Sequence, residues 1–284
     1  ALGGLLRRRR LVSAAVALSV AAIPGLARAH YVVDRSSAPF VECTTAQCGG
    51  IAIATPTTQE APTVRPPTAA PIPFPFRYWG QNVDSVTISP TGYLTFGPLS
   101  NVTANAKVPV PGSPNNLIAA FWDDLRLNVS NPTSIVRYGT SGTAPDRVFV
   151  VEWRNLQAAN ARGSSHNSYS FQVRLYEGSN EITLHYGGAN ATGTNPPTFT
   201  ATIGIEGPTG NEGFELSDVN CSPGCTAASF PVNQVIKLIP APDLVVSSVT
   251  SPGLYFSGAP VQVRATVRNA GGTAATAARL RYIL

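Results

Sequence analysis

The sequence predicts an all-β fold, an antiparallel two-sheet β-sandwich that is followed by the start of a second β module. Short runs of alternating apolar and polar residues fill the stretch from residue 74 to about residue 238, and Gly, Pro and Asn turns separate them. No long stretch shows helical periodicity. Such a stretch, about 165 residues with eight or more strands, is long enough to bury a substantial core between two sheets.

Pairs of these runs have turn sequences between them. Residues 169–175 and 182–186 both alternate, and the Gly-containing loop 177–181 joins them as a hairpin. The same holds for residues 86–88 and 93–96, which the sequence SPTG joins. Residues 199–205 alternate in the same way. Neighbouring strands are therefore expected to be antiparallel and to share one core.

The first 29 residues have the features of a secretory signal peptide. Arginines occupy positions 7–10, an apolar run covers residues 11–23, and the sequence A-R-A ends at Ala29, so cleavage is expected between Ala29 and His30. Thirteen apolar residues are too few to cross about 30 Å of hydrocarbon, which argues against a membrane anchor. The arginine-rich start also fits a loose twin-arginine export pattern. The mature chain is expected to be exported, with no stable membrane span.

The mature chain is electrically balanced. Five of the twenty basic residues lie in the leader, whereas all fifteen acidic residues lie beyond it. A neutral chain without a basic cluster lacks the electrostatic pattern that binding to a phosphate backbone requires. Nucleic acid is therefore excluded as an expected partner.

Four cysteines occur as two closely spaced pairs, Cys43 with Cys48 and Cys221 with Cys225. An even number in an exported chain favours disulfides, and local pairing is the simplest arrangement. Loops this short contribute roughly 2 kcal/mol each, so these bonds would hold local turns. A four-thiolate zinc site is the alternative, although the spacings and the lack of nearby histidines weigh against it.

The chain divides into four parts by composition. After the leader (1–29), residues 30–73 are rich in Pro, Thr and Ala, which predicts an extended, poorly packed lead-in with one cysteine turn. Residues 74–240 form the sandwich. Residues 241–284 alternate again, but some forty residues cannot supply the seven or so strands of an immunoglobulin-like sandwich, so only a partial Ig-like β-sandwich is expected. Because the chain lacks a first Met and stops at Leu284 within a predicted strand, it is expected to be a piece of a longer protein.

The middle part contains a series of strand motifs at residues 74–80 (FPFRYWG), 86–97 (VTISPTGYLTFG), 116–125 (NLIAAFWDDL), 148–155 (VFVVEWRN), 171–177 (FQVRLYE) and 201–206 (ATIGIE). In these motifs and their order it resembles the nidogen-like extracellular β domain of bacterial surface proteins. Residues 242–246 (PDLVV) and 267–272 (VRNAGG) resemble the start of the cell-adhesion-related domain found in bacteria, CARDB. Both resemblances imply an extracellular protein of adhesion or matrix contact, and neither brings a catalytic motif.

No common catalytic motif is present, and the chain is predicted not to be an enzyme. His185 alternates with apolar neighbours and is expected to face solvent. His166, in a loop with Ser164 and Ser165, is expected to be hydrated, because adjacent residues rarely have triad geometry.

Asp123 and Asp124 directly follow an apolar run and could offer hard oxygen ligands to Ca²⁺ at a strand end. The alternative is that the inward carboxylate accepts backbone or Arg hydrogen bonds while the other is solvated. No other cofactor is indicated.

Aromatic residues in the strand motifs are expected to form the core rather than an exposed carbohydrate platform. They are Trp79, Trp122, Trp153, Phe74, Phe76, Tyr78 and Phe121. The N-glycosylation sequons at Asn101, Asn128 and Asn190 matter only in a eukaryotic host.

Together these observations predict a non-catalytic, exported bacterial surface or secreted protein that binds an unknown extracellular protein or glycan in adhesion or matrix binding. The alternative is that its modules are accessories or spacers of a larger exported enzyme or stalk protein, whose catalytic part lies beyond residue 284.

Overall fold

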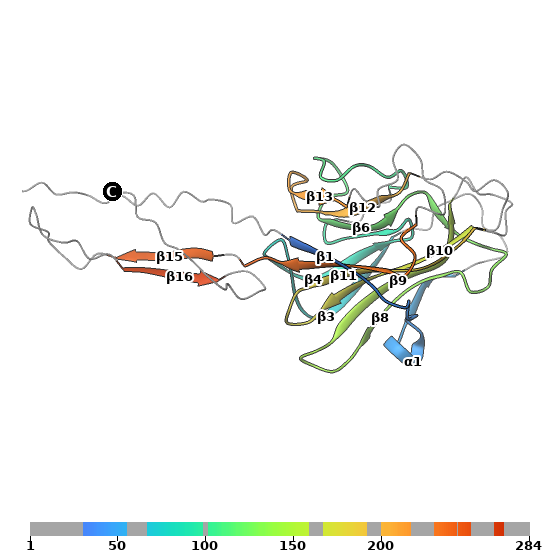
Figure 1. Cartoon of the computed structure of the whole chain (residues 1–284), viewed down its shortest axis with the longest axis horizontal. Coiled ribbons are helices and arrows are strands. Elements are labelled where there is room, and N and C mark those ends of the chain that lie inside the picture. Colours follow the sequence, from blue (N-terminus) through green and yellow to red (C-terminus); the bar gives the residue numbers. More distant parts are fainter. Residues whose placement is uncertain are drawn as a thin grey trace, which may run out of the picture.

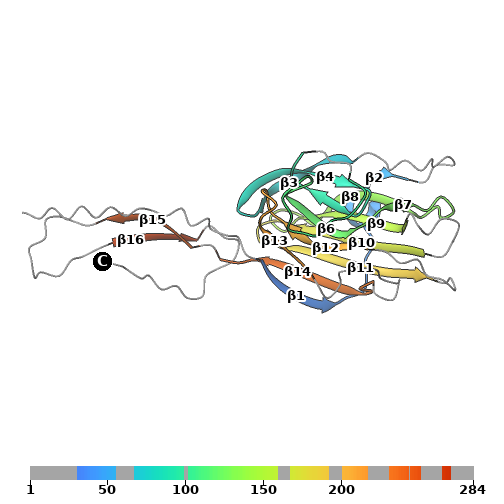
Figure 2. The same ribbon diagram turned by 90° about the horizontal axis from the view of Figure 1, so that it is seen from above.

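The computed structural model describes residues 31–55, 67–98, 102–158, 167–191, 200–216, 230–242, 244–250 and 264–269. Two antiparallel sheets pack face to face (Figures 1 and 2), which confirms the predicted all-β two-sheet sandwich. In the described part of the chain the helical content is one short helix, α1 (Thr45–Cys48).

The larger sheet, sheet A, has the order β1-β14-β11-β10-β9-β8-β2, with β7 paired to β9. Its strands are β1 (Tyr31–Ser37), β2 (Ile51–Ala54), β7 (Leu125–Leu127), β8 (Ile135–Ser141), β9 (Val148–Ala158), β10 (Asn167–Tyr176), β11 (Ile182–Ala191) and β14 (Gln234–Pro240). Strands β10 and β11 pair from Leu175 and Ile182 outward, so the predicted hairpin is confirmed.

The smaller sheet, sheet B, has the order β13-β12-β6-β5-β4-β3. Its strands are β3 (Thr68–Tyr78), β4 (Gln81–Ser89), β5 (Tyr93–Thr95), β6 (Leu117–Trp122), β12 (Thr202–Glu206) and β13 (Gly213–Glu215). The predicted turn between β4 and β5 is present and depends on Gly92, which has φ +91° and whose missing Cβ would collide with the carbonyl of Phe121.

Strand β3 lies at the edge of sheet B, and its sequence suits that position. Alternate residues from Ile72 to Phe76 are buried, and the residues between them are exposed prolines. Proline has no N–H to offer to another strand, so the exposed edge cannot easily pair with a second chain.

The core between the sheets is largely aromatic. Trp153 on β9 is fully buried and stacks on Phe171, with ring centroids 5.2 Å apart. Its indole N–H donates to the carbonyl of Ser89 on β4 at 2.8 Å, which ties sheet A to sheet B.

The expected lead-in is wrong for its described part. Strand β1 pairs with β14 along its whole length, from Tyr31 opposite Pro240 to Ser37 opposite Gln234, and β2 pairs with β8. Strand β3 starts at Thr68, ahead of the expected boundary at residue 74. The reason is backbone pairing: β1 and β2 complete the two opposite edges of sheet A, which would otherwise present unpaired N–H and C=O groups.

Beyond the sandwich, β15 (Leu244–Thr250) and β16 (Arg264–Asn269) pair as a separate two-stranded antiparallel sheet. The alternation after residue 242 therefore marks strands, as expected.

Candidate functional site

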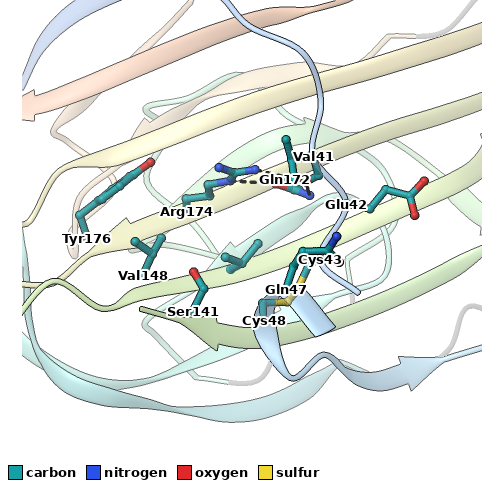
Figure 3. A pocket seen from close by; sticks show the side chains of 11 residues that line it. Val41, Glu42, Cys43, Gln47, Cys48, Ser141, Val148, Gln172, Arg174 and Tyr176 are labelled. Carbon is teal, nitrogen blue, oxygen red and sulfur yellow. Dashed lines mark hydrogen bonds between the residues drawn. A yellow bond between two sulfur atoms is a disulfide. The ribbon is translucent and has the colours of Figure 1, made fainter. Parts of the chain in front are cut away.

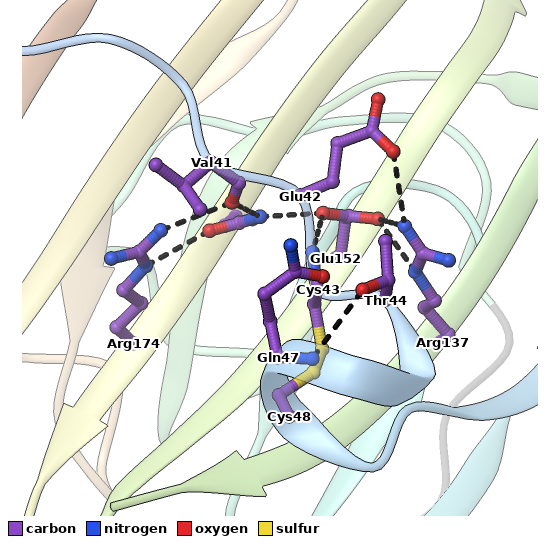
Figure 4. Close-up of a disulfide and its surroundings, with 10 residues drawn as sticks. Val41, Glu42, Cys43, Thr44, Gln47, Cys48, Arg137, Glu152 and Arg174 are labelled. Atoms are coloured by element: carbon purple, nitrogen blue, oxygen red, sulfur yellow. Dashed lines mark hydrogen bonds and ion pairs between the residues drawn. A yellow bond between two sulfur atoms is a disulfide. The ribbon is translucent and has the colours of Figure 1, made fainter.

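The segment that joins β1 to β2, residues 38–50, crosses the outer face of sheet A and is called the strap below. It passes over β11, where Phe40 lies so close to Gly187 that a Cβ there would be 2.8 Å from the phenyl ring. It then passes over β10, where the amide of Gln172 donates to the carbonyl of Val41 at 2.7 Å. The strap thus covers a sheet face that would otherwise be open to solvent (Figure 4).

A disulfide closes the tight turn of the strap over β8. Cys43 and Cys48 are bonded, with their Cα atoms 5.4 Å apart, and this confirms the predicted local pair. Helix α1 fills the turn: Thr44 caps its first turn, and Gly49 ends it in the left-handed conformation with φ 60°. A Cβ at Gly139 would collide with the carbonyl of Cys48, so a glycine on β8 is needed for the turn to rest there.

Glu152 on β9 anchors the strap from below and is fully buried. One carboxylate oxygen accepts from the backbone N–H of Cys43 at 2.7 Å and from the amide of Gln172. The other oxygen accepts from Nε of Arg137 on β8, also at 2.7 Å (Figure 4). Because a buried carboxylate requires both a counter-charge and hydrogen-bond donors, this network holds strap and sheet together.

Beside the disulfide, the strap leaves a hollow of about 200 Å³ above β8, β9 and β10 (Figure 3). The apolar side of the hollow consists of Val148, Val150 and the disulfide, which pack together in one small cluster. Arg174 on β10 also lines the hollow.

His185 is buried, with 9% of its surface exposed, so the expectation that it faces solvent is wrong. It does point away from the core, as the alternation predicts, but the strap passes over this part of β11. Its Nε2 lies 2.9 Å from the hydroxyl of Thr183. Burial, and to a lesser degree the charge of Arg174, lowers the pKa of His185 from 6.5 to about 4.

His185 should make the protein less stable in mild acid. Between its ordinary pKa of 6.5 and its folded value of about 4, the unfolded chain takes up a proton that the folded chain does not. Unfolding is therefore favoured as the pH falls through this window, by up to about 3 kcal/mol. We expect the free energy of unfolding to fall less for His185→Gln than for the wild type when the pH is lowered from 7.5 to 4.5. All other groups are shared, so parallel curves for the two proteins would contradict this prediction.

Asp123 and Asp124 lie just after β6. Asp123 accepts from the backbone N–H of Asp124 at 2.9 Å and from that of Thr200 at 3.4 Å, while Asp124 pairs with Arg126 at 3.3 Å. Burial raises the pKa of Asp123. These contacts are the ones expected if the two carboxylates accept backbone and arginine hydrogen bonds and do not bind Ca²⁺. Among the described residues, no group of three His, Cys, Asp or Glu side chains is arranged to hold a metal ion.

Calcium binding by this pair stays a prediction. We expect millimolar Ca²⁺ to raise the melting temperature of residues 30–240 relative to chelator, because a ligand that binds only the folded state stabilises it, by about 1.4 kcal/mol at ten times its Kd. Asp123→Asn combined with Asp124→Asn should abolish the rise. Identical melting temperatures in Ca²⁺ and chelator would remove the prediction.

The aromatic motif residues pack as core, as expected. The main core holds Trp153, Phe74, Phe76, Tyr78 and Phe121, with Trp79 partly buried against it. Trp122 is buried in a second, smaller cluster with Tyr93. A shared exposed carbohydrate platform is therefore not formed by these side chains.

Several predicted features lie outside the described residues. They are the leader 1–29 with its cleavage site at Ala29 and His30, the loop with Ser164, Ser165 and His166, the second cysteine pair Cys221 and Cys225, and the sequon at Asn101. Within the described ranges, no helix has the length and apolar character to cross a membrane.

Sequence reasoning missed the strap, Glu152 and Arg174. A signal was present: β9 alternates Phe149, Val151 and Trp153 into the core with Val150 and Glu152 on the outer face. The apolar Val150 on the outer face indicates that this part of the face is covered, whereas Glu152 alone would equally suit a solvated face. The pattern does not indicate what covers it.

The family model described as "NIDO related" matches residues 30–246, which include α1, the strap and every strand of both sheets. No curated protein and no solved structure matches the chain.

Proposed function

Because this chain belongs to the NIDO-related family, we propose that it is a non-catalytic extracellular binding module of an exported bacterial protein. The partner is an extracellular protein or glycan, and the role is adhesion or matrix binding. The observation that carries the proposal is the extent of the family match, which spans the whole sandwich. Domains of this family are typically extracellular.

The Cys43–Cys48 disulfide supports the extracellular part of the proposal. Disulfides form and persist in oxidising compartments, outside the cell or in the periplasm, and are rare in the cytosol. The bond is integrated in the fold, because it closes the turn that rests on β8.

The use made of the buried ionisable groups supports a binding role over catalysis. The carboxylate of Glu152 is engaged by the strap and by Arg137, and His185 contacts Thr183. Asp123 lies elsewhere, at the end of β6, where it accepts backbone hydrogen bonds. Nucleophile, base and orienting group must meet for covalent catalysis. Glu152 and Asp123 instead accept hydrogen bonds in different parts of the fold, and His185 contacts a residue of its own strand.

The hairpin β15–β16 is proposed to begin an Ig-like module of the CARDB kind. Residues 242–246 and 267–272 carry this proposal, together with the antiparallel pairing of the two strands. A tandem of β modules suits a protein that presents one sandwich away from the cell surface.

Labelled chain from His30 onward, applied to cells and isolated extracellular matrix of the producing organism, tests the proposed function. We expect saturable binding that heat-unfolded protein does not show. Binding that stays at the level of the unfolded control would count against adhesion.

A further inference from the structure

The hollow beside the disulfide (Figure 3) has the size of a site for a small chemical group. Its volume of about 200 Å³ lies below the roughly 300–1,000 Å³ of pockets for drug-sized ligands. Such a volume suits one terminal group of a larger partner.

Apolar and polar groups line different parts of the hollow. Val148 on β9 forms the more exposed apolar wall, and Val150 and the Cys43–Cys48 disulfide, which are 3 to 5% exposed, lie beneath it as the floor. Ser141 and Gln47, both of which line the hollow, can exchange hydrogen bonds with a bound group.

Arg174 is a guanidinium held in place without a carboxylate partner among the described ion pairs. Its Nε donates to the side-chain oxygen of Gln172 at 2.9 Å, and one terminal nitrogen donates to the carbonyl of Val41 at 3.2 Å. Two neutral acceptors orient the group and leave its charge uncompensated. A guanidinium fixed in this way is pre-organised for a carboxylate, which it can bind through two parallel hydrogen bonds.

The charges around the hollow also favour an anion. Arg137, Arg154 and Arg174 lie on this face with two carboxylates, Glu42 and Glu152. Glu42 lines the hollow, but its carboxylate pairs with Arg154 at 2.7 Å, and Glu152 pairs with Arg137. Farther along the same face Lys237 pairs with Glu181 at 2.8 Å, so the positive charge that remains beside the hollow is that of Arg174.

We propose that this hollow binds the C-terminal residue of a partner polypeptide, with its carboxylate on Arg174 and a short apolar side chain against Val148 and Val150. The wall and floor formed by Val148 and Val150 favour this ligand over an acidic sugar, because they offer no polar partner to sugar hydroxyl groups. The inference rests on the proposed function and names the kind of partner.

The probe is the dipeptide N-acetyl-alanyl-valine, titrated into the chain from His30 onward and followed by NMR of the Val148 and Val150 methyl groups. We expect saturable shifts, and at least tenfold weaker binding for the same dipeptide with a C-terminal amide. Arg174→Gln should weaken binding of the acid at least tenfold. Lys237→Gln is the matched control, because it removes one positive charge from the same sheet face two strands away, about 10 Å; it should change affinity less than twofold.

Val148→Phe gives a test that does not depend on charge, since the larger side chain would fill the hollow and abolish binding while Arg174 stays in place. Melting temperatures establish that each variant is folded, and this variant decides the matter if Arg174→Gln does not fold. Equal binding of acid and amide, undiminished binding by folded Arg174→Gln or Val148→Phe, or no methyl shifts would overturn the proposal. Tighter binding of glucuronate than of the dipeptide would overturn it in favour of an acidic sugar.

Failure here is distinguishable from failure of the proposed function. Saturable binding to matrix without dipeptide binding removes the hollow as the contact site and leaves adhesion standing. Dipeptide binding without any binding to cells or matrix supports the site and counts against adhesion.

Discussion

Glu152→Ala should lower the free energy of unfolding by about 3 to 5 kcal/mol, the range found when one partner of a buried ion pair is removed. The substitution removes the close counter-charge of Arg137, whose largely buried guanidinium then has Glu42 at 3.8 Å, and it leaves the backbone N–H of Cys43 without an acceptor. Denaturant unfolding of the chain from His30 onward measures the effect.

The strap should lose its protection first, because the backbone N–H of Cys43 in the disulfide turn donates to Glu152. Amide exchange at Cys43 should therefore accelerate in folded Glu152→Ala protein, while amides in the centre of sheet B keep their protection. Glu42→Gln is the control: Glu42 is partly exposed and pairs with Arg154 at 2.7 Å and more distantly with Arg137 at 3.8 Å, which keeps Glu152, so its loss should cost less than about 1 kcal/mol. Similar costs for the two variants would contradict the anchoring role of Glu152.

Trp153→Ala should cost about 3 to 5 kcal/mol, because it removes a fully buried indole and leaves a cavity between the sheets. It also removes the hydrogen bond to the carbonyl of Ser89, which joins β9 to β4 across the core. Thermal and denaturant unfolding give the magnitude.

Trp153→Phe separates the two contributions. A phenyl ring can still stack on Phe171 but cannot donate to Ser89, whose buried carbonyl then lacks this partner. That carbonyl keeps a longer hydrogen bond from the backbone N–H of Gly92 at 3.4 Å, so the loss of the indole bond costs about 1 kcal/mol and the Phe variant should lie between wild type and the Ala variant. If the Ala variant were as stable as wild type, Trp153 could not be a core residue.

Local alternation was sufficient to identify several strands and two of the hairpins. Residues 169–175 and 182–186 alternate, the loop between them contains Gly178, and they form the β10–β11 hairpin. A hairpin is predictable in this way because its two strands and its turn are neighbours in the sequence. The aromatic residues of the strand motifs were assigned to the core because of the motifs in which they lie; Phe121 and Trp122, which are consecutive, are buried in two different clusters.

The residues of the candidate site were not predictable from such patterns, because their partners are far away along the chain. Glu152 accepts from the N–H of Cys43, 109 residues earlier, and Gln172 donates to Val41, 131 residues earlier. Pro and Thr content suggested a poorly packed lead-in, yet β1 and β2 are ordered by the free edges of sheet A. Composition reflects the local preferences of a segment and does not indicate whether a distant sheet edge is available to pair with it.

The sequence by itself determined that the chain folds into antiparallel strands, which strands form hairpins, which aromatic residues are buried, and that Cys43 pairs locally with Cys48. Only the tertiary structure decided that the outer face of sheet A is covered, that His185 is therefore buried, and that Arg174 lines a hollow beside the disulfide. The physical reason is that strand periodicity specifies on which face of a sheet a side chain lies, whereas the environment of that face depends on a distant segment whose path is set by backbone pairing at the sheet edges.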